Sequence, residues 1–193
     1  MSIQSVIFDL DGTITRPILD FKAIRRDMGL AGYNGHILEA LKHLPRHQQK
    51  KAIEVLDQHE HKAVELSELN PGAAELLNYL SKHNLPIGIL TRNTHANAQA
   101  VAEKHNLQFD CIIGRDDGPV KPDPYGILRI CEIFKVAPEN TLMVGDYLHD
   151  MICAQQAGAQ GVLLENNVNA SDFRKYAVFT INNLDQLMHI IDI

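Results

Sequence analysis

The fold class of this chain follows from the stretch Val6-Ile7-Phe8-Asp9-Leu10-Asp11-Gly12-Thr13. Its first three residues are apolar β-formers, which predicts a short buried strand that ends at Asp9. A second acid, Asp11, follows two residues later. Two carboxylates directly after a buried strand are costly to desolvate together, and a divalent cation beside them would offset their repulsion. Because an Asp-Gly turn after a strand is also common, this stretch alone leaves both interpretations open.

Strands and helices alternate along the chain from residue 70 onward. The pattern predicts strands over 86–90, 109–113, 141–144 and 161–164, and helices over 73–82, 94–105, 124–134, 148–157 and 184–190, with Asn70-Pro71 as the start of the first of these helices. Alternating strands and helices build a parallel sheet that is covered on both faces. The predicted fold class is therefore α/β, with a doubly wound parallel sheet.

The segment from Pro17 to Leu69 has a different character, because it lacks strand-like runs and is rich in Lys, Glu, His and Gln. Helical patterns cover residues 21–28, 36–44 and 48–66. The segment interrupts the alternation directly after the first strand. We therefore expect a small α-helical cap domain, residues 17–69, inserted into an α/β core domain made of residues 1–16 and 70–193.

The charge balance is acidic, with 18 Lys and Arg against 24 Asp and Glu and a formal net charge of -6. Nucleic acids and membranes attract basic surfaces, so we expect neither as a partner. The three cysteines form no CxxC pair, and neither a secretory signal nor an apolar run of roughly 18 residues is visible. These features predict a cytoplasmic protein, monomeric or a small homo-oligomer.

Three further polar clusters fall where ligands of such sheets bind, beyond the carboxyl ends of the strands. Thr91-Arg92-Asn93 follows the second predicted strand. A hydroxyl and free backbone N–H groups there would hold a phosphate, although Thr and Asn also cap helices routinely. Lys121 lies in a proline-rich loop, where it either neutralises an anionic centre or is a solvated surface charge.

The last cluster is Gly145-Asp146-Tyr147-Leu148-His149-Asp150. A spacing of four residues places Asp146 and Asp150 on one side of an opening helical turn. Carboxylates of this kind suit Mg²⁺, but acids are favoured at helix N-termini in any case. One function accounts for all four clusters in order, whereas the alternative requires four separate coincidences.

The ordered set of Asp9-Leu10-Asp11-Gly12-Thr13, Thr91, Lys121-Pro122 and Gly145-Asp146-x-x-x-Asp150 resembles the haloacid dehalogenase superfamily, and within it the phosphoglycolate phosphatase-like hydrolases. The match extends to about residue 165, and the helical segment stands where that family carries a cap. The resemblance implies Mg²⁺-dependent hydrolysis of a small phosphomonoester, phosphoglycolate- or sugar-phosphate-like, through an aspartyl-phosphate intermediate.

The resemblance also implies a role for each motif residue. Asp9 would be the nucleophile, Asp11 the general acid and base, and Lys121 the charge-balancing catalytic residue. Thr91 would bind the phosphate, with Arg92 and Asn93 as neighbouring substrate-binding candidates. The metal ligands would be the carboxylates of Asp9 and Asp146, the backbone carbonyl of Asp11, and Asp150 either directly or through water.

Other activities of the superfamily remain open on these motifs. The acid at position 11 favours a phosphate ester over a haloacid, because a halide leaves without a proton. Phosphonate-cleaving relatives need a cap lysine, and the cap contains Lys22, Lys42, Lys50, Lys51 and Lys62. A phosphosugar mutase would pass the phosphoryl group to a sugar hydroxyl instead of water, and a binding or regulatory domain would keep the fold without turnover.

Overall fold

The computed structural model describes residues 2–33 and 35–191. By compactness the chain divides into two units, one of residues 1–17 with 68–193 and one of residues 18–67. The assignment of residues 17–69 as a separate cap domain stays a prediction.

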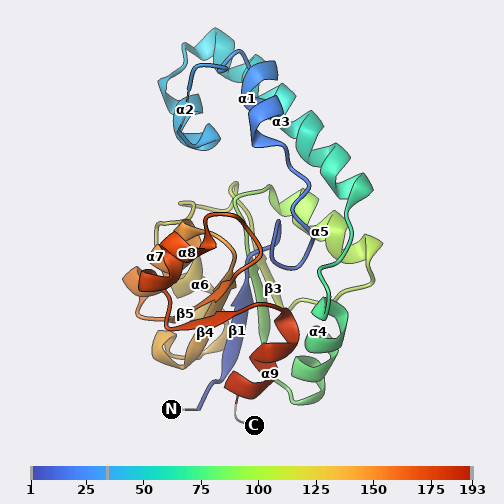
Figure 1. Ribbon diagram of the computed structural model, residues 1–193, viewed down its shortest axis with the longest axis vertical. Coiled ribbons are helices and arrows are strands. Elements are labelled where there is room, and N and C mark those ends of the chain that lie inside the picture. Colours follow the sequence, from blue (N-terminus) through green and yellow to red (C-terminus); the bar gives the residue numbers. More distant parts are fainter. Residues whose placement is uncertain (1, 34, 192–193) are drawn as a thin grey trace. The chain divides into compact units, whose positions relative to one another are not determined.

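The larger unit is built on a six-stranded parallel sheet with the order β3-β2-β1-β4-β5-β6 (Figure 1). The strands are β1 (Ser5–Phe8), β2 (Ile87–Leu90), β3 (Cys111–Ile113), β4 (Thr141–Gly145), β5 (Gln160–Leu164) and β6 (Phe179–Ile181). The order runs outward from β1 in both directions, so the topological switch point lies between β1 and β4. The predicted doubly wound α/β fold, with a helical cap inserted after its first strand, is confirmed.

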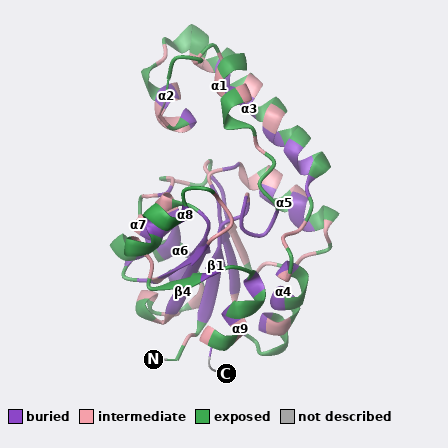
Figure 2. Ribbon diagram, in the orientation of Figure 1, coloured by how far each residue is buried: buried purple, intermediate pink, exposed green. Residues whose placement is uncertain are grey.

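Helices cover both faces of this sheet (Figure 1). They are α4 (Ala73–Lys82), α5 (His95–Lys104), α6 (Tyr125–Phe134), α7 (Leu148–Ala157), α8 (Ala170–Phe173) and α9 (Leu187–Ile190), with short 3₁₀ turns η1 (Pro138–Asn140), η2 (Arg174–Tyr176) and η3 (Leu184–Gln186). Ile7 and Met143 are paired in register and pack with Ile127 and Ile130 of α6 and Cys153 of α7. Burial on both faces explains why the strands read as continuous apolar runs (Figure 2).

The smaller unit consists of helices α1 (Phe21–Asp27), α2 (Ile37–His43) and α3 (Arg46–Leu66). Asp20 caps α1, because its Oδ1 accepts the backbone N–H groups of Lys22 and Ala23. Ile24, Ile37 and Leu56 form a small apolar cluster, one residue from each helix. Across residues 2–33 and 35–191, the structure contains no helix with both the length and the apolar character that a bilayer crossing requires.

The predicted helix over 73–82 matches α4, but this helix begins after a left-handed Gly72 and not at Asn70-Pro71. Some other predicted boundaries were wrong. The predicted strand over 109–113 begins only at Cys111, and the predicted last helix over 184–190 opens as the 3₁₀ turn η3. Strand β6 was missed, because two of its three side chains are exposed and such an edge strand lacks a clear apolar pattern.

Candidate active site

Three buried acids meet at the carboxyl edge of the sheet. Phe8 and Val144 are paired in register, so the residues that follow β1 and β4 leave the sheet side by side. The Asp9 backbone N–H donates to the Val144 carbonyl at 2.8 Å, which extends this pairing to the acid itself. Asp150 comes from the first turn of α7, and its Oδ2 accepts the Tyr147 backbone N–H. One carboxylate oxygen from each of Asp9, Asp146 and Asp150 lies within 4.8 Å of the others.

Lys121 lies between two of these acids. Its Nζ donates to Asp9 Oδ1 and to Asp150 Oδ1, both at 2.6 Å, and only 2% of its side chain is exposed. A buried ammonium is stable only with such partners. Burial disfavours the charged form, but the Asp150 and Asp9 carboxylates outweigh it and raise the pKa of the Lys121 side chain above its ordinary value. Lys121 is therefore a fixed positive charge inside the acidic cluster.

Burial and mutual repulsion disfavour the ionised forms of the acids in this cluster. Burial, together with the charges of Asp9 and Asp150, raises the pKa of Asp146 to about 8. Burial raises the pKa of Asp9 to about 6, although Lys121 pulls it the other way. Burial and the neighbouring Asp9 charge raise the pKa of Asp11 to about 6, against a hydrogen bond from Asn93. The single positive charge of Lys121 does not neutralise this cluster, so a further cation would stabilise the ionised acids.

The donor set fits a hard divalent cation. The cluster offers carboxylate oxygens only, which Mg²⁺ prefers over nitrogen or sulfur. Two glycines make room for the acid side chains, because a Cβ on Gly12 would lie 2.6 Å from Asp146 Oδ2 and one on Gly145 would lie 2.2 Å from Asp150 Cγ. The backbone thus approaches both acids more closely than any residue with a side chain would permit.

Substituting Gly12 tests whether the acidic cluster needs a glycine at this position, once the cost of backbone strain is removed by a control. We expect Gly12→Ala to lower the melting temperature and to remove stabilisation by added Mg²⁺, since its new methyl group would press on Asp146. Gly158→Ala is the matched control, because Gly158 is also left-handed, with φ 77° against 93°, but a Cβ there would meet no atom within 4 Å. Each left-handed alanine costs about 1–2 kcal/mol. Equal Mg²⁺ responses of the two variants in a thermal melt would contradict this role of Gly12.

The other predicted residues lie around this cluster in two groups. Asn93 Nδ2 donates to Asp11 Oδ2 at 3.1 Å, and Thr91 Oγ1 accepts the Asn93 backbone N–H at 3.0 Å. Thr91, Asn93 and Asp11 are thus brought together at the end of β2. Arg92 instead donates from Nη1 to the backbone carbonyl of Lys121. The structure therefore joins Arg92 to the loop that carries the lysine.

Three asparagines that the sequence does not mark as site residues hold the acidic loops. Asn70 Nδ2 donates to the carbonyls of Gly12 and Thr13 at 2.9 and 2.7 Å and lies 3.1 Å from that of Thr15. Asn166 also donates to the Gly12 carbonyl, and Asn167 donates to the carbonyl of Asp146. Both follow β5, so the rule that ligands gather at strand ends was the available signal for them.

The fold and this cluster define a class of protein, the Rossmann-like α/β proteins with a helical insert after the first strand and an acidic cluster at the carboxyl edge of the sheet. The family model for haloacid dehalogenase-like hydrolases matches residues 19–164. The chain therefore belongs to the haloacid dehalogenase-like hydrolase family, as its motifs implied. The prediction that it is an enzyme of this family is confirmed.

Known proteins resemble the chain along most of its length. It is 31% identical to an uncharacterized hydrolase of Saccharomyces cerevisiae, over 99% of this chain and 90% of the yeast protein. It is 27% identical to a phosphoglycolate phosphatase of Chromobacterium violaceum, over 83% of this chain and 84% of that one. The crystal structure of a hydrolase from Pseudomonas syringae superposes with a TM-score of 0.81 at 25% identity, over 98% and 99% of the two chains.

Proposed function

We propose that the protein is a Mg²⁺-dependent phosphatase that hydrolyses a small phosphomonoester through an aspartyl phosphate on Asp9. The observation that carries this proposal is the placement of Lys121, whose Nζ lies 2.6 Å from both Asp9 and Asp150 inside a buried acidic cluster. Phosphoryl transfer depends on positioning and on charge neutralisation around the phosphate more than on elaborate chemistry. A buried cation beside a carboxylate at the strand end supplies both.

In the first step an Asp9 carboxylate oxygen attacks phosphorus and the bond from phosphorus to the ester oxygen breaks. Asp11 gives its proton to that leaving oxygen. Thr91 and neighbouring backbone N–H groups hold the phosphoryl oxygens, and Lys121 offsets negative charge on Asp9 and on the phosphate. The raised pKa of Asp11, about 6, keeps a protonated fraction available near neutral pH.

In the second step Asp11, now ionised, takes a proton from a water molecule that attacks the phosphorus of the aspartyl phosphate. Inorganic phosphate leaves and Asp9 returns to a free carboxylate. Asp9, Asp146, Asp150 and the backbone carbonyl of Asp11 would hold Mg²⁺. When bound, the ion supplies positive charge to the phosphoryl oxygens and to the acids around it.

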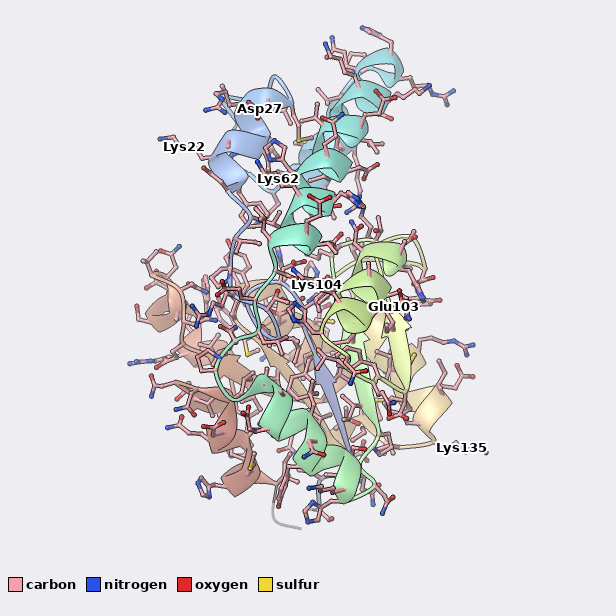
Figure 3. All side chains as sticks on the ribbon, turned by 90° about the vertical axis from the view of Figure 1, so that its right-hand side faces the viewer. Lys22, Asp27, Lys62, Glu103, Lys104 and Lys135 are labelled. Carbon is pink, nitrogen blue, oxygen red and sulfur yellow. The ribbon has the colours of Figure 1, made fainter. Side chains whose placement is uncertain are left out.

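The substrate class follows from the chemistry and from one relative. Similarity to a phosphoglycolate phosphatase supports a small phosphate ester such as phosphoglycolate or a sugar phosphate. A Schiff-base lysine is typically a buried one, whereas the five cap lysines are all exposed, among them Lys22 and Lys62 (Figure 3). This favours ester hydrolysis over phosphonate cleavage.

A screen of phosphate esters with purified protein and Mg²⁺ tests the proposal. We expect inorganic phosphate to appear with at least one small ester, to stop on addition of EDTA and to return with excess Mg²⁺. Turnover of a sugar phosphate without release of inorganic phosphate would reveal a mutase. Metal-independent hydrolysis would refute the assigned ligand set, and no turnover with any ester would refute the phosphatase.

The acidic cluster also predicts how Mg²⁺ and pH affect stability. An acid whose pKa is higher in the folded than in the unfolded protein favours the folded state at low pH, and this contribution is lost as pH rises toward the folded pKa. For Asp9, Asp11 and Asp146 that window runs from the ordinary value of 3.8 to about 6, 6 and 8. We therefore expect metal-free protein to lose stability across this window, and Mg²⁺ to raise the melting temperature more at about pH 8 than at about pH 5.

Asp146→Asn isolates one charge from this effect. In EDTA at about pH 8 the variant should melt several degrees above wild type, because a buried and repelled charge is gone, while its response to Mg²⁺ should disappear. Asp172→Asn, at an exposed acid on α8, is the control and should change neither quantity. A destabilised Asp146→Asn in EDTA would show that the acids do not repel one another as described.

A further inference from the structure

The side chain of Asn93 connects Asp11 to the first turn of helix α5. Its Nδ2 donates to Asp11 Oδ2 at 3.1 Å. Its Oδ1 accepts two hydrogen bonds, from the Thr94 backbone N–H and from Asn97 Nδ2, each at 2.8 Å. Asn93 itself is buried, with 4% of its surface exposed, and its three contacts are partly buried. Both ends of this amide are therefore engaged within the protein.

These contacts fix which way the amide faces. A backbone N–H can only donate, so the end of Asn93 that meets Thr94 must be the carbonyl oxygen. The opposite end, Nδ2, is then directed at Asp11. Asn97 reinforces this orientation and is itself held in the first turn of α5, where its backbone N–H donates to Thr94 Oγ1 at 3.2 Å. The helix thus orients Asn97, and Asn97 helps to orient Asn93.

The orientation has a chemical consequence for Asp11. A carboxamide NH₂ group donates hydrogen bonds and does not accept them. Asp11 Oδ2 therefore accepts whether Asp11 is ionised or neutral. A carbonyl oxygen accepts more strongly than a hydroxyl oxygen, so this hydrogen bond favours Oδ2 as the carbonyl oxygen of a neutral Asp11 and Oδ1 as the oxygen that carries the proton. The two oxygens of this carboxyl group are thus made unequal by their neighbours.

We propose that Asn93, supported by Asn97, is a positioning residue that reserves Oδ1 of Asp11 for proton transfer to the leaving group. The inference rests on the proposed phosphatase reaction. As the ester bond to phosphorus breaks, its electron pair goes to the leaving oxygen, and the proton on Oδ1 moves to that oxygen. Asn93 makes no contact with the reacting atoms in this assignment. This positioning role differs from the phosphate-binding role that the sequence suggests for Asn93, and the two roles have different experimental consequences.

Leaving groups of different basicity separate these roles. An alkoxide needs a proton to depart, whereas nitrophenolate departs without one. For Asn93→Ala with Mg²⁺, we expect kcat/KM to fall by about 100-fold on the best alkyl phosphate and by less than about threefold on p-nitrophenyl phosphate. kcat/KM reports the steps up to transfer onto Asp9, so the later role of Asp11 as a base does not enter. Inhibition by inorganic phosphate should remain as in wild type.

Two further variants support the assignment. Asn97→Ala keeps Asn93 but removes one contact that orients it, and should show a smaller loss that is again confined to alkyl phosphates. It also carries the test if Asn93→Ala does not fold. Gln99→Ala is the control, because Gln99 is exposed on the same helix and its side chain donates to Glu103 rather than to Asn93 or Asn97. Its ratio of alkyl to nitrophenyl activity should equal that of wild type.

An equal fall of kcat/KM on both classes of ester would overturn the inference, and so would weaker inhibition by inorganic phosphate in Asn93→Ala. The second result would instead make Asn93 a phosphate ligand. A wild-type protein that hydrolyses neither class with Mg²⁺ would overturn the proposed phosphatase function itself. The two failures are therefore distinguishable from the wild-type measurement alone.

Discussion

Asp9→Asn is expected to lower phosphate release by about 10⁴-fold or more at saturating Mg²⁺. The amide has nearly the same shape as the carboxylate but lacks the charged oxygen that attacks phosphorus. It also keeps an oxygen that can accept the hydrogen bond from Lys121 Nζ, which lies 2.6 Å from Asp9 Oδ1 in the native protein. The loss should therefore be chemical rather than structural.

Folding of this variant is checked by circular dichroism and by its melting temperature in EDTA. Removing a buried acid whose pKa is raised to about 6 should leave that temperature equal to or above the wild-type value near neutral pH. Asp172→Asn, which removes an exposed acid, is the control for the loss of one negative charge. Turnover of Asp9→Asn within about tenfold of wild type would remove Asp9 as the nucleophile.

Lys121→Met is expected to have the second-largest effect, on stability as well as on activity. Methionine fills a similar volume but leaves the Asp9 and Asp150 carboxylates facing each other without the ammonium that lies 2.6 Å from each. Breaking a buried ion pair in this way costs about 3–5 kcal/mol. Turnover should fall by about 10²–10³-fold, since a fixed charge at the transferred phosphoryl group is lost.

Mg²⁺ supplies an internal check on this variant. Because the acidic cluster of Lys121→Met carries one more uncompensated charge, Mg²⁺ should raise its melting temperature by more than it raises that of wild type. Lys135→Met, at the exposed lysine directly after α6 (Figure 3), is the matched control and should match wild type in both assays. An unchanged melting temperature of Lys121→Met in EDTA would contradict the buried ion-pair network.

The strand-end acids could be predicted because their positions follow from a local pattern. A parallel sheet brings the carboxyl ends of its strands to one edge, so the acids after β1 and β4, Asp9 and Asp146, had to lie close together. Lys121 carries no such signal, since its loop follows β3, two strands away from β1 in the sheet. Only its place in an ordered set of motifs singled it out among the lysines.

The supporting asparagines could not be predicted from local pattern. Asn70 reaches backbone carbonyls that are 55–58 residues away in the sequence, and Asn166 reaches one that is 154 residues away. Asparagine is common in turns for purely local reasons, so its presence there gives no hint of such distant contacts. The same cause explains why Asn70-Pro71 has the form of a helix start without being one, since α4 begins at Ala73 and the Asn70 side chain donates to distant carbonyls.

The central claim, that the Asp9 carboxylate attacks phosphorus, is tested most directly by trapping the phosphoryl enzyme. The protein is mixed with a turned-over ester and Mg²⁺, quenched within a turnover and treated with borohydride, which reduces an acyl phosphate to an alcohol. Mass spectrometry of the tryptic peptide that ends at Lys22, since trypsin does not cleave between Arg16 and Pro17, should then show homoserine at position 9. The homoserine should appear only when both ester and Mg²⁺ were present. Homoserine at Asp11 or Asp146 instead, or an unmodified Asp9 during rapid phosphate release, would contradict the account.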